Sequence, residues 1–598
     1  MVKYNPTDKR HKSVVGAVAE NEVFTLSVEC AGANRVFFCF WADGGKQVYK
    51  RFMRRTEGDT YSVSVSMALR GLYFYYFEAE TARGVKYICK GDLLDGVALD
   101  NLGEPYQLTV YGGNADTAAW FKGGVAYHVF IDRFFKGGEH GYPKGAVVNG
   151  DIFAVPDHRP VDGKVLNNEF FGGDLDGIRL KLPYIASLGI TVIYLSPFCE
   201  SNSNHKYNVG DFLSVDGGFG GERALEALIA EAAEYGIKII MDGVYSHTGD
   251  DSVYFNKYGS YDSVGACQSK DSPYYGWYTF TRYPDRYKTW WGIDTLPEVN
   301  KLNASYRDFI CGEVLPEWLG KGVAGVRLDV VDELPDEFLY PLCAAVRENG
   351  DNIVIGEVWE NATDKIAYGR RRKYFQGGQL DSVMNYPLKD AVISLMRDGD
   401  GRKFVNLLLT QIDAYPKACL DKLFNMLSSH DTKRAVTAIS GDDVKGKDAQ
   451  AAYRMEGERL ETAVKKFMAA SVLQYTLYGV PCLYYGDEAG LQGFGDPFCR
   501  ACYPWGRENG ELVKFFARLG ALRRDELFKD ALTENIAFEG GVLSFDRIKS
   551  GRGVNVAVNV GADNAEITLK GRVVLGKMPA DGEKSARLAP YEFIIAAF

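Results

Sequence analysis

A single structural unit recurs along the middle of this chain: a short apolar run, then a loop, then a stretch with helical periodicity. Apolar runs of strand length are typical of buried parallel strands, which crossover helices must connect. One such helix is expected at 222–235, with Gly236 in the position of a C-terminal cap. Eight such runs occur, at 125–130, 190–195, 237–244, 325–330, 352–359, 380–386, 424–431 and 480–488. Eight units predict an α/β fold, the (β/α)8 TIM barrel.

The segments on either side of this repeat follow another pattern. Short alternating runs separated by Gly and Asp fill residues 1–118, as in an antiparallel sandwich. Residues 516–598 begin with a helical stretch and then return to strand patterns. We therefore expect an N-terminal β-sandwich over 1–118, the barrel over 119–515 and a C-terminal β-sandwich over 516–598. The loop after the third strand is long and rich in Tyr, Trp, Asp and Gly, so we expect an inserted subdomain at 248–300.

Charge and composition limit the kinds of partner that the chain can bind and the cell compartment in which we expect it. Lys and Arg number 69 against 79 Asp and Glu, a net charge of −10 that would repel a phosphate backbone, so no nucleic-acid partner is expected. No apolar run approaches the ~20 residues that span a bilayer, so no membrane partner is expected. The first ten residues lack the apolar core of a secretory signal, which favours a cytoplasmic location and leaves a mature secreted form open.

The cysteines do not indicate a disulfide framework. There are 11, scattered and odd in number. Cys499 and Cys502 form a lone C-x-x-C with no second pair and no neighbouring His. Buried free thiols are therefore expected there in preference to zinc.

Polar residues cluster where the predicted strands end. In a TIM barrel the carboxyl ends of all strands converge on one site. Taken singly, each residue has a structural explanation: an Asp that caps a helix, a buried ion pair, a histidine satisfied in the core. Taken together, at four strand ends, they predict the carboxylate and carboxylic acid that glycosidic cleavage requires. The residues are Asp242 and His247, Arg327 and Asp329, Glu357 and Trp359, and His430 and Asp431.

The segments around these residues resemble the short motifs of the α-amylase superfamily of retaining α-glucan enzymes. The resemblance covers about 120 to 515, and the motifs stand in the family's order and spacing. The first four are DGVYSH at 242–247, GVRLDV at 325–330, GEVW at 356–359 and SHD at 429–431, and LPEVN at 296–300 resembles the motif of the inserted segment. The resemblance implies the barrel fold and double displacement at a glucosidic bond.

Roles for individual residues follow from this resemblance. Asp329 would be the nucleophile, Glu357 the general acid and base, and Asp431 the carboxylate that stabilises the distorted sugar. Arg327 would keep Asp329 ionised. The resemblance also implies that Asp242, His247, His430 and a stacking tyrosine, Tyr207, bind the sugar at the point of cleavage, although Tyr207 also fits a core position.

Further motifs resemble the neopullulanase, cyclomaltodextrinase and maltogenic amylase group. The segment SSHD at 428–431 has Ser where many α-amylases have Asn. In DPFCR at 496–500, Asp496 and Arg500 would grip glucose units on the non-reducing side, and Trp359 would offer a platform on the reducing side. That group's N-terminal domain often mediates dimerisation or binds glucan, so a homodimer is an expectation.

Two departures from the family pattern bear on metals and on the subgroup. Ser246 replaces the Asn that ligates a structural Ca²⁺ in many α-amylases, and its hydroxyl is a poorer ligand. The sequence therefore leaves the metal ligands unknown. LPEVN is closer to the α-amylase form than to the neopullulanase form. The chemistry itself is expected to need no cofactor.

These features predict a retaining hydrolase of α-1,4 and also α-1,6 bonds in maltooligosaccharides, cyclodextrins, pullulan or starch. One alternative is an α-glucan transferase with the same residues and a different acceptor preference. The other is a non-catalytic glucan-binding protein on a relic barrel, which the presence of all three carboxylates disfavours.

Overall fold

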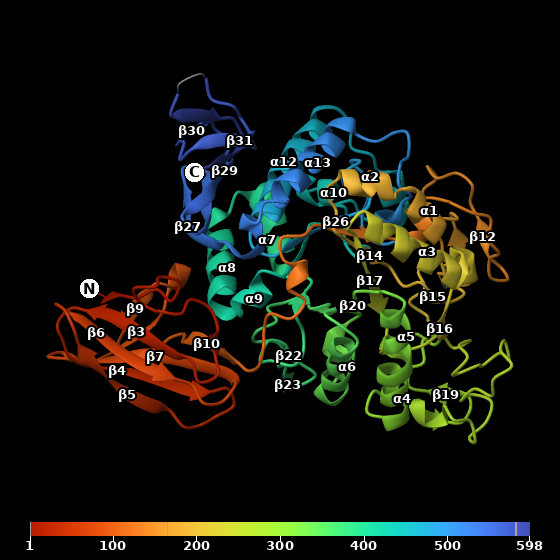
Figure 1. Ribbon diagram of the computed structural model, residues 1–598, viewed down its shortest axis with the longest axis horizontal. Helices are drawn as coiled ribbons and strands as arrows, with labels where there is room; N and C mark the ends of the chain where they lie inside the picture. The colour runs from red at the N-terminus through yellow and green to blue at the C-terminus, as the bar shows by residue number, and fades with distance from the viewer. Residues whose placement is uncertain (1, 164, 581–582) are drawn as a thin grey trace.

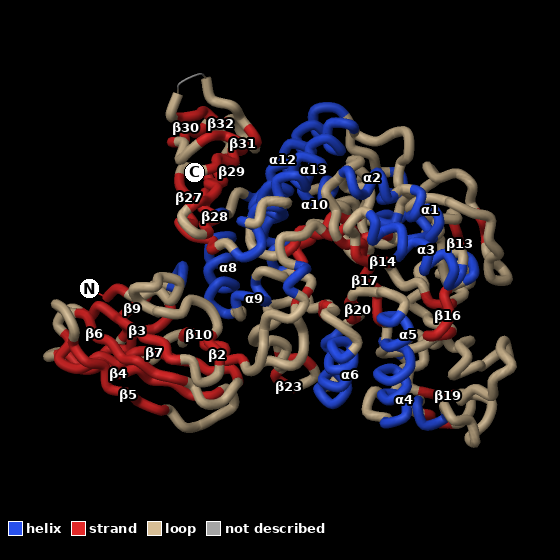
Figure 2. The backbone as a smooth tube through the Cα atoms, viewed as in Figure 1, coloured by secondary structure: helices blue, strands red, loops and turns tan. Residues whose placement is uncertain are grey.

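The computed structural model describes residues 2–163, 165–580 and 583–598. Its centre is a ring of eight parallel strands surrounded by helices (Figures 1 and 2). In spatial order the strands are β24 (Ser382–Val383), β21 (Ile353–Gly356), β20 (Gly325–Leu328), β17 (Lys238–Gly243), β14 (Val192–Leu195), β11 (Ala126–Val129), β26 (Val480–Tyr484) and β25 (Phe424–Met426). Each lies inside one of the eight predicted runs, which confirms the predicted TIM barrel.

The ring closes between its two end strands by a single parallel bridge, Met384 to Phe424. Side-chain amides reinforce this joint. Asn385 Nδ2 donates to Asn425 Oδ1 at 2.9 Å, Gln411 Nε2 donates to Asn385 Oδ1 at 2.8 Å, and the Asn385 backbone N–H donates to the Phe424 carbonyl. The closure therefore depends on three amides more than on a ladder of backbone pairs.

Side chains alternate between the barrel interior and the surrounding helices. On β14, Val192 and Tyr194 belong to the interior cluster, while Ile193 packs outward with the helices. The outer layer consists of α1 (Leu175–Leu180), α2 (Leu182–Ser187), α3 (Gly221–Glu234), α5 (Leu315–Gly320), α6 (Asp336–Glu348), α7 (Tyr386–Asp398), α8 (Gly401–Ala414), α12 (Gly457–Thr476) and α13 (Gly510–Arg523). Helix α3 ends as predicted, because Gly236 has φ +70° just after it.

Residues before the barrel form a β-domain with its own apolar core. Strand β5 is shared between its two sheets: Met53 pairs with Val36 of β4, whereas Arg54 and Arg55 pair with β6. The main strands are β3 (Val23–Cys30), β4 (Ala33–Ala42), β5 (Tyr49–Arg55), β6 (Thr60–Ser66), β7 (Gly71–Thr81), β8 (Gly84–Lys90), β9 (Gly96–Leu99) and β10 (Tyr106–Tyr111), with β1 (Val2–Lys3) and β2 (Val18–Ala19) at the edges.

The chain after α13 forms a second β-domain. One sheet has the order β27 (Leu532–Glu539), β28 (Val542–Lys549), β29 (Arg552–Asn559), β33 (Phe593–Ala597) and β31 (Arg572–Gly576), and the other pairs β30 (Ala565–Thr568) with β32 (Ser585–Leu588). Figure 1 shows the N-terminal domain in red and the C-terminal domain in dark blue on the same side of the barrel. Among the described residues, none of the helices is both long and apolar enough to cross a membrane.

Two long excursions leave the carboxyl end of the barrel. The first, between β11 and α1, contains β12 (Val147–Val148) and β13 (Glu169–Phe170). The second, between β17 and α4 (Ala304–Phe309), carries the hairpin of β18 (Phe280–Arg282) and β19 (Arg286–Tyr287). Its end folds back on the residues that directly follow β17, since Glu298 bridges to His247 and the Val299 N–H donates to the Ser246 carbonyl.

Candidate active site

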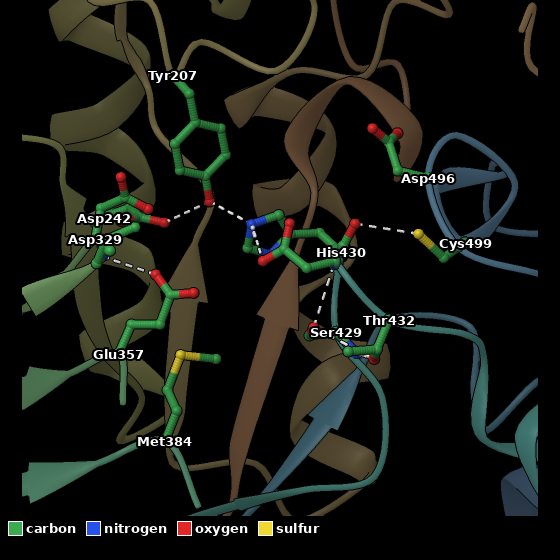
Figure 3. A network of polar contacts seen from close by, with 12 residues as sticks. Tyr207, Asp242, Asp329, Glu357, Met384, Ser429, His430, Thr432, Asp496 and Cys499 are labelled. Carbon is green, nitrogen blue, oxygen red and sulfur yellow. Dashed lines mark hydrogen bonds and ion pairs between the residues drawn. The ribbon is translucent and has the colours of Figure 1, made fainter. Parts of the chain in front are cut away.

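Three carboxylates meet on one buried guanidinium. Arg327 lies on β20, and its Nη1 donates to Asp242 Oδ1 at 2.7 Å and to Asp329 Oδ1 at 3.0 Å. Its Nη2 donates to Glu357 Oε2 at 2.7 Å. The barrel brings these residues together because β17, β20 and β21 are consecutive, with Asp242 in register with Arg327. Figure 3 shows the carboxylates side by side.

Strand periodicity explains why these side chains point inward. Ile353 and Ile355 of β21 face the barrel interior, so Glu357, two residues further, continues on the same side. Ile240 and Asp242 have the same relation on β17. The interior of the barrel is apolar below this level and charged at its carboxyl end.

Burial and the neighbouring guanidinium shift the pKa values of the carboxyl groups in opposite directions. Burial raises the pKa of Asp329 well above the ordinary 3.8, Glu357 and Asp242 raise that pKa further, and Arg327 opposes all three effects. Burial likewise raises the pKa of Asp242, again against Arg327 and against hydrogen bonds from two tyrosines. Without the guanidinium, several carboxylates could not remain ionised so close together.

The two oxygens of Glu357 have different environments. Oε2 accepts the Arg327 hydrogen bond and a second one, at 2.8 Å, from the backbone N–H of Val330. Val330 has φ +36°, a strained conformation for a β-branched residue that directs its N–H at the acid. Oε1 accepts from Trp359 Nε1 at 2.9 Å. A proton on Glu357 therefore belongs on Oε1.

Tyr207 and two histidines line the same site. The Tyr207 hydroxyl donates to Asp242 Oδ2 at 2.8 Å and lies 2.6 Å from His430 Nε2, with the two rings stacked (Figure 3). His247 Nε2 lies 3.0 Å from the Tyr207 carbonyl. Burial lowers the pKa of His247 to about 4 and that of His430 well below 6.5, so both rings are neutral at pH 7. Each Nδ1 is buried without a protein partner in the described structure, which leaves it free for a ligand.

Asp431, Asp496 and Arg500 form a second charged group on the opposite side of His430. Arg500 Nη1 lies 3.0 Å from Asp496 Oδ1 and Nη2 lies 3.5 Å from Asp431 Oδ1. Arg500 Nε also donates to the His430 carbonyl at 2.9 Å. Burial raises the pKa of Asp431, while Arg500 and Arg327 lower it.

The C-x-x-C pair, Cys499 and Cys502, lies next to the group of Asp431, Asp496 and Arg500. Cys499 Sγ lies 3.1 Å from the His430 carbonyl, and both Cys499 and Cys502 are buried free thiols, as expected. Within the described ranges, no three His, Cys, Asp or Glu side chains are grouped so that they could hold a metal ion. Ser246 is fully buried, and its hydroxyl has no partner there.

All eleven candidate residues thus lie at the carboxyl end of the barrel. The sequence analysis did not identify several residues that contact them and hold them in place. Tyr194 donates to Asp242 Oδ2 at 2.6 Å, and Met384 Sδ lies 3.4 Å from Arg327 Nε. Tyr194 lies in an apolar run, where alternation could have placed it inside the barrel. The Val330 N–H has no sequence signal, because a backbone donor can belong to any residue.

A large recess of the described structure lies elsewhere. It has a volume of about 1040 Å³ and lies between the N-terminal domain, α8 and β27. None of the candidate residues lines it. The site therefore rests on the convergence of charged side chains and not on cavity size.

Comparisons with known proteins agree with this geometry. A family model described as the alpha amylase catalytic domain matches residues 128–535. An amylopullulanase of Thermoanaerobacter thermohydrosulfuricus is 31% identical over 91% of this chain and 40% of its own length. A cyclomaltodextrinase of Geobacillus thermopakistaniensis is 30% identical over 80% of this chain and 77% of its own. This chain spans less than half of the amylopullulanases it matches.

A solved structure extends the likeness of the fold to the flanking domains. The type III pullulan hydrolase from Thermococcus kodakarensis superimposes with a TM-score of 0.70 at 23% identity, covering 100% of both chains. The likeness therefore includes both β-domains as well as the barrel.

Proposed function

Because this chain belongs to the alpha-amylase family through its catalytic domain, we propose that it is a retaining α-glucan hydrolase. Its bonds would be α-1,4 and also α-1,6, in maltooligosaccharides, cyclodextrins, pullulan or starch. Relatives named amylopullulanase, cyclomaltodextrinase and neopullulanase support this range. The observation that carries the proposal is the Arg327 guanidinium, which is hydrogen-bonded to Asp242, Asp329 and Glu357.

The first chemical step uses Asp329 and Glu357. An Asp329 oxygen attacks C1 of the glucosyl unit while Glu357 passes its Oε1 proton to the leaving oxygen, and the glucosidic bond breaks. In the second step Glu357 takes a proton from water, the water oxygen bonds to C1, and Asp329 leaves. Retention predicts carboxyl groups about 5–5.5 Å apart. Their attachment to the two Nη atoms of one guanidinium supports a separation of this order.

The other residues would bind and orient the sugar. Asp431, with His247 and His430, offers hydrogen bonds to the hydroxyls at the cleaved unit, and Tyr207 offers its ring as a stacking surface. Asp496 and Arg500 would hold the non-reducing side. Trp359 would contact the reducing side, since its indole lies against Glu357 and is 45% exposed.

No cofactor takes part in these steps, because nucleophile, acid and base are all side chains. At Ser246 a lone hydroxyl stands where the family has an amide ligand, so we assign no calcium there. The family resemblance allows a structural calcium ion, whose ligands the sequence leaves unknown. A melting temperature that falls in EDTA and recovers with added Ca²⁺ would establish it.

Product analysis tests the activity. The protein and its Glu357→Gln variant would be incubated separately with pullulan, β-cyclodextrin and soluble starch, and the sugars separated by size. Panose or maltose, released fastest from pullulan or the ring and absent with the variant, is the expected result. Mixed oligosaccharides from starch alone would indicate an α-amylase, and longer or branched products a transferase. No products from any substrate would contradict the proposal.

We also propose a cytoplasmic homodimer. All eleven cysteines are free thiols, which suits a reducing compartment. The N-terminal domain would provide the interface, and its strand β5 exposes Tyr49 and Phe52. Cell fractionation and light scattering of the purified chain test the two statements.

A further inference from the structure

A small hairpin joins the N-terminal domain to the barrel. Its strands are β22 (Ile366–Ala367) and β23 (Arg370–Arg371), and Figure 1 shows them between the red N-terminal domain and helix α6. The hairpin belongs to the loop at 358–381, which connects β21 to β24 and begins directly after Glu357. Contacts that hold this loop can therefore affect the general acid.

Two side-chain contacts attach the loop to the N-terminal domain. Arg371 Nε donates to Asp43 Oδ2 at 2.8 Å, and Arg371 Nη2 donates to Asp43 Oδ1 at 3.0 Å. Gln107 of β10 donates from Nε2 to Thr363 Oγ1 at 2.9 Å. A guanidinium and a carboxylate that are joined at two points fix direction as well as distance. Asp43, which directly follows β4, therefore holds the hairpin in one orientation.

The next residue of the hairpin contacts the barrel. Successive residues of an extended chain point to opposite sides, so Arg372 reaches away from the N-terminal domain. Arg372 is buried, and its Nη2 donates to the Leu334 carbonyl and, at 3.4 Å, to the Val331 carbonyl. Neighbouring arginines thus connect the N-terminal domain to the turn at 331–334.

The same loop also holds this turn at Asp332. The Tyr374 hydroxyl donates to Asp332 Oδ1 at 2.5 Å, and Lys365 Nζ lies 3.1 Å from Asp332 Oδ2. Arg372 Nε donates to the Tyr374 hydroxyl at 3.0 Å, which links these contacts to those of the arginine. The turn is therefore held through both its main chain and its carboxylate.

This turn directly follows two residues of the candidate active site. Asp329 is the proposed nucleophile, and Val330 donates its N–H to Glu357 Oε2 at 2.8 Å. Val330 has φ +36°, and a β-branched residue keeps such a conformation only where the surrounding structure fixes it. The contacts of Arg372, Lys365 and Tyr374 fix the chain immediately after it.

We propose that Asp43 of the N-terminal domain is a positioning residue for the general acid, Glu357. Through Arg371 it holds the hairpin, and the hairpin holds the turn that aims the Val330 N–H at Glu357 Oε2. This inference rests on the proposed function. It gives the N-terminal domain a role in catalysis by its own chain, separate from the proposed dimer interface. Because Asp43 acts through two intermediate contacts, its loss should weaken the chemical step and not abolish it.

The test compares a leaving group that needs a proton with one that does not. For Asp43→Ala we expect kcat on maltoheptaose to fall about fivefold with KM within about twofold, the effect of weakening one oriented hydrogen bond. The burst of fluoride from α-maltosyl fluoride, which needs no proton, should keep its rate within about twofold. Asp43→Arg/Arg371→Asp, which restores the pair with the charges exchanged, should recover most of the maltoheptaose activity. Glu80→Gln, which breaks an exposed ion pair with Arg35 inside the N-terminal domain, is the control.

Hydrogen exchange detected by mass spectrometry shows whether the effect follows the proposed contacts. In Asp43→Ala, amides of 330–334 and of the loop at 358–381 should exchange faster, and those of β14 and β17 should not change. Unchanged exchange at 330–334 would overturn the inference.

The kinetic outcomes separate this inference from the proposed function. Equal losses on maltoheptaose and α-maltosyl fluoride for Asp43→Ala, or no loss on either, would show that Asp43 does not act through the acid and would leave the hydrolase intact. A folded wild-type protein that cleaves neither substrate would overturn the proposed function and the inference with it.

Discussion

At the scale of single residues, the positive charge of one arginine allows the carboxylates of the site to be ionised close together. Arg327 is fully buried and balances three carboxylates of which two, Asp242 and Asp329, have a raised pKa because of burial. Removing one partner of such a cluster leaves the others under-compensated, so each substitution has consequences for both chemistry and stability.

Glu357→Gln should lower hydrolysis of maltoheptaose by ~10³-fold or more, with the fold unchanged by circular dichroism. The amide has no proton to give the leaving oxygen. α-Maltosyl fluoride, whose leaving group needs no proton, should still release fluoride in a burst. Glu360→Gln, three residues later and exposed, is the matched control. Near-wild-type turnover of the Glu357→Gln variant on maltoheptaose would show that Glu357 is not the general acid.

Asp329→Asn should abolish turnover and raise the melting temperature at pH 7 by ~2–4 °C. Burial raises the pKa of Asp329 in the folded state, so above that pKa its ionised form costs folding free energy that an amide does not. The gain should shrink as the pH falls and vanish below the ordinary pKa of 3.8, where the carboxyl is protonated in both states. Calorimetry from pH 4 to 8 measures it, and a gain that grows toward low pH would refute the argument.

Most residues of the site could be predicted because their roles depend on the type of side chain, which the sequence gives directly. Asp242, Arg327, Asp329 and Glu357 occur at ends of apolar runs, and only a barrel makes such ends converge. The Val330 N–H and the packing of the Trp290 ring against His247 could not be predicted, since they depend on a left-handed backbone and on how the inserted segment folds back.

At the scale of elements, the predicted runs are longer than the strands. The run at 424–431 contains only β25 (Phe424–Met426), and the run at 380–386 contains only β24 (Ser382–Val383). Residues 427–430 and 384–386, beyond the two strands, are still buried although they pair with no neighbouring strand over most of their length. Burial without backbone pairing gives the same apolar pattern as a strand, so pattern alone cannot locate the strand end.

Asn385→Ala should destabilise the closure of the barrel by about 1–3 kcal/mol, because Asn425 and Gln411 would lose a buried amide partner. Amides of β24 and β25 should exchange hydrogen faster than those of β14 and β17. Hydrogen exchange detected by mass spectrometry reads this directly. Asn101→Ala, exposed in a loop of the N-terminal domain, should change neither strand pair. Uniform acceleration across the barrel would show that the amides do not act at the joint.

At the scale of the whole molecule, the N-terminal domain is attached to the barrel by a buried ion pair. Lys12 Nζ donates to Asp413 Oδ1 of α8 at 2.7 Å and to the Gly16 carbonyl at 2.8 Å, and Lys12 is fully buried. Composition shifts in the sequence could predict two flanking β-domains. They could not predict this contact, whose partners are 401 residues apart.

Lys12→Met should weaken this attachment by about 3–5 kcal/mol, because Asp413 would remain buried without its counter-charge. Lys12→Met/Asp413→Leu should recover most of the loss. In calorimetry the single variant should show an early transition of the N-terminal domain before the barrel unfolds. Lys3→Met, which removes an exposed ion pair with Glu29, is the control. If the double variant is no more stable than the single one, the ion pair does not govern the attachment.

The hydrogen bond from Val330 to Glu357 has a consequence for how such a chain can change over time. It comes from the main chain, so every substitution at position 330 except proline preserves the donor. Mutation can exchange the Trp359 side chain beside Oε1 and the Arg327 side chain beside Oε2, but it leaves the main-chain donor at Oε2 in place. One of the three donors to the acid is therefore inherited with the fold itself, and divergence toward new products acts through the two side-chain donors.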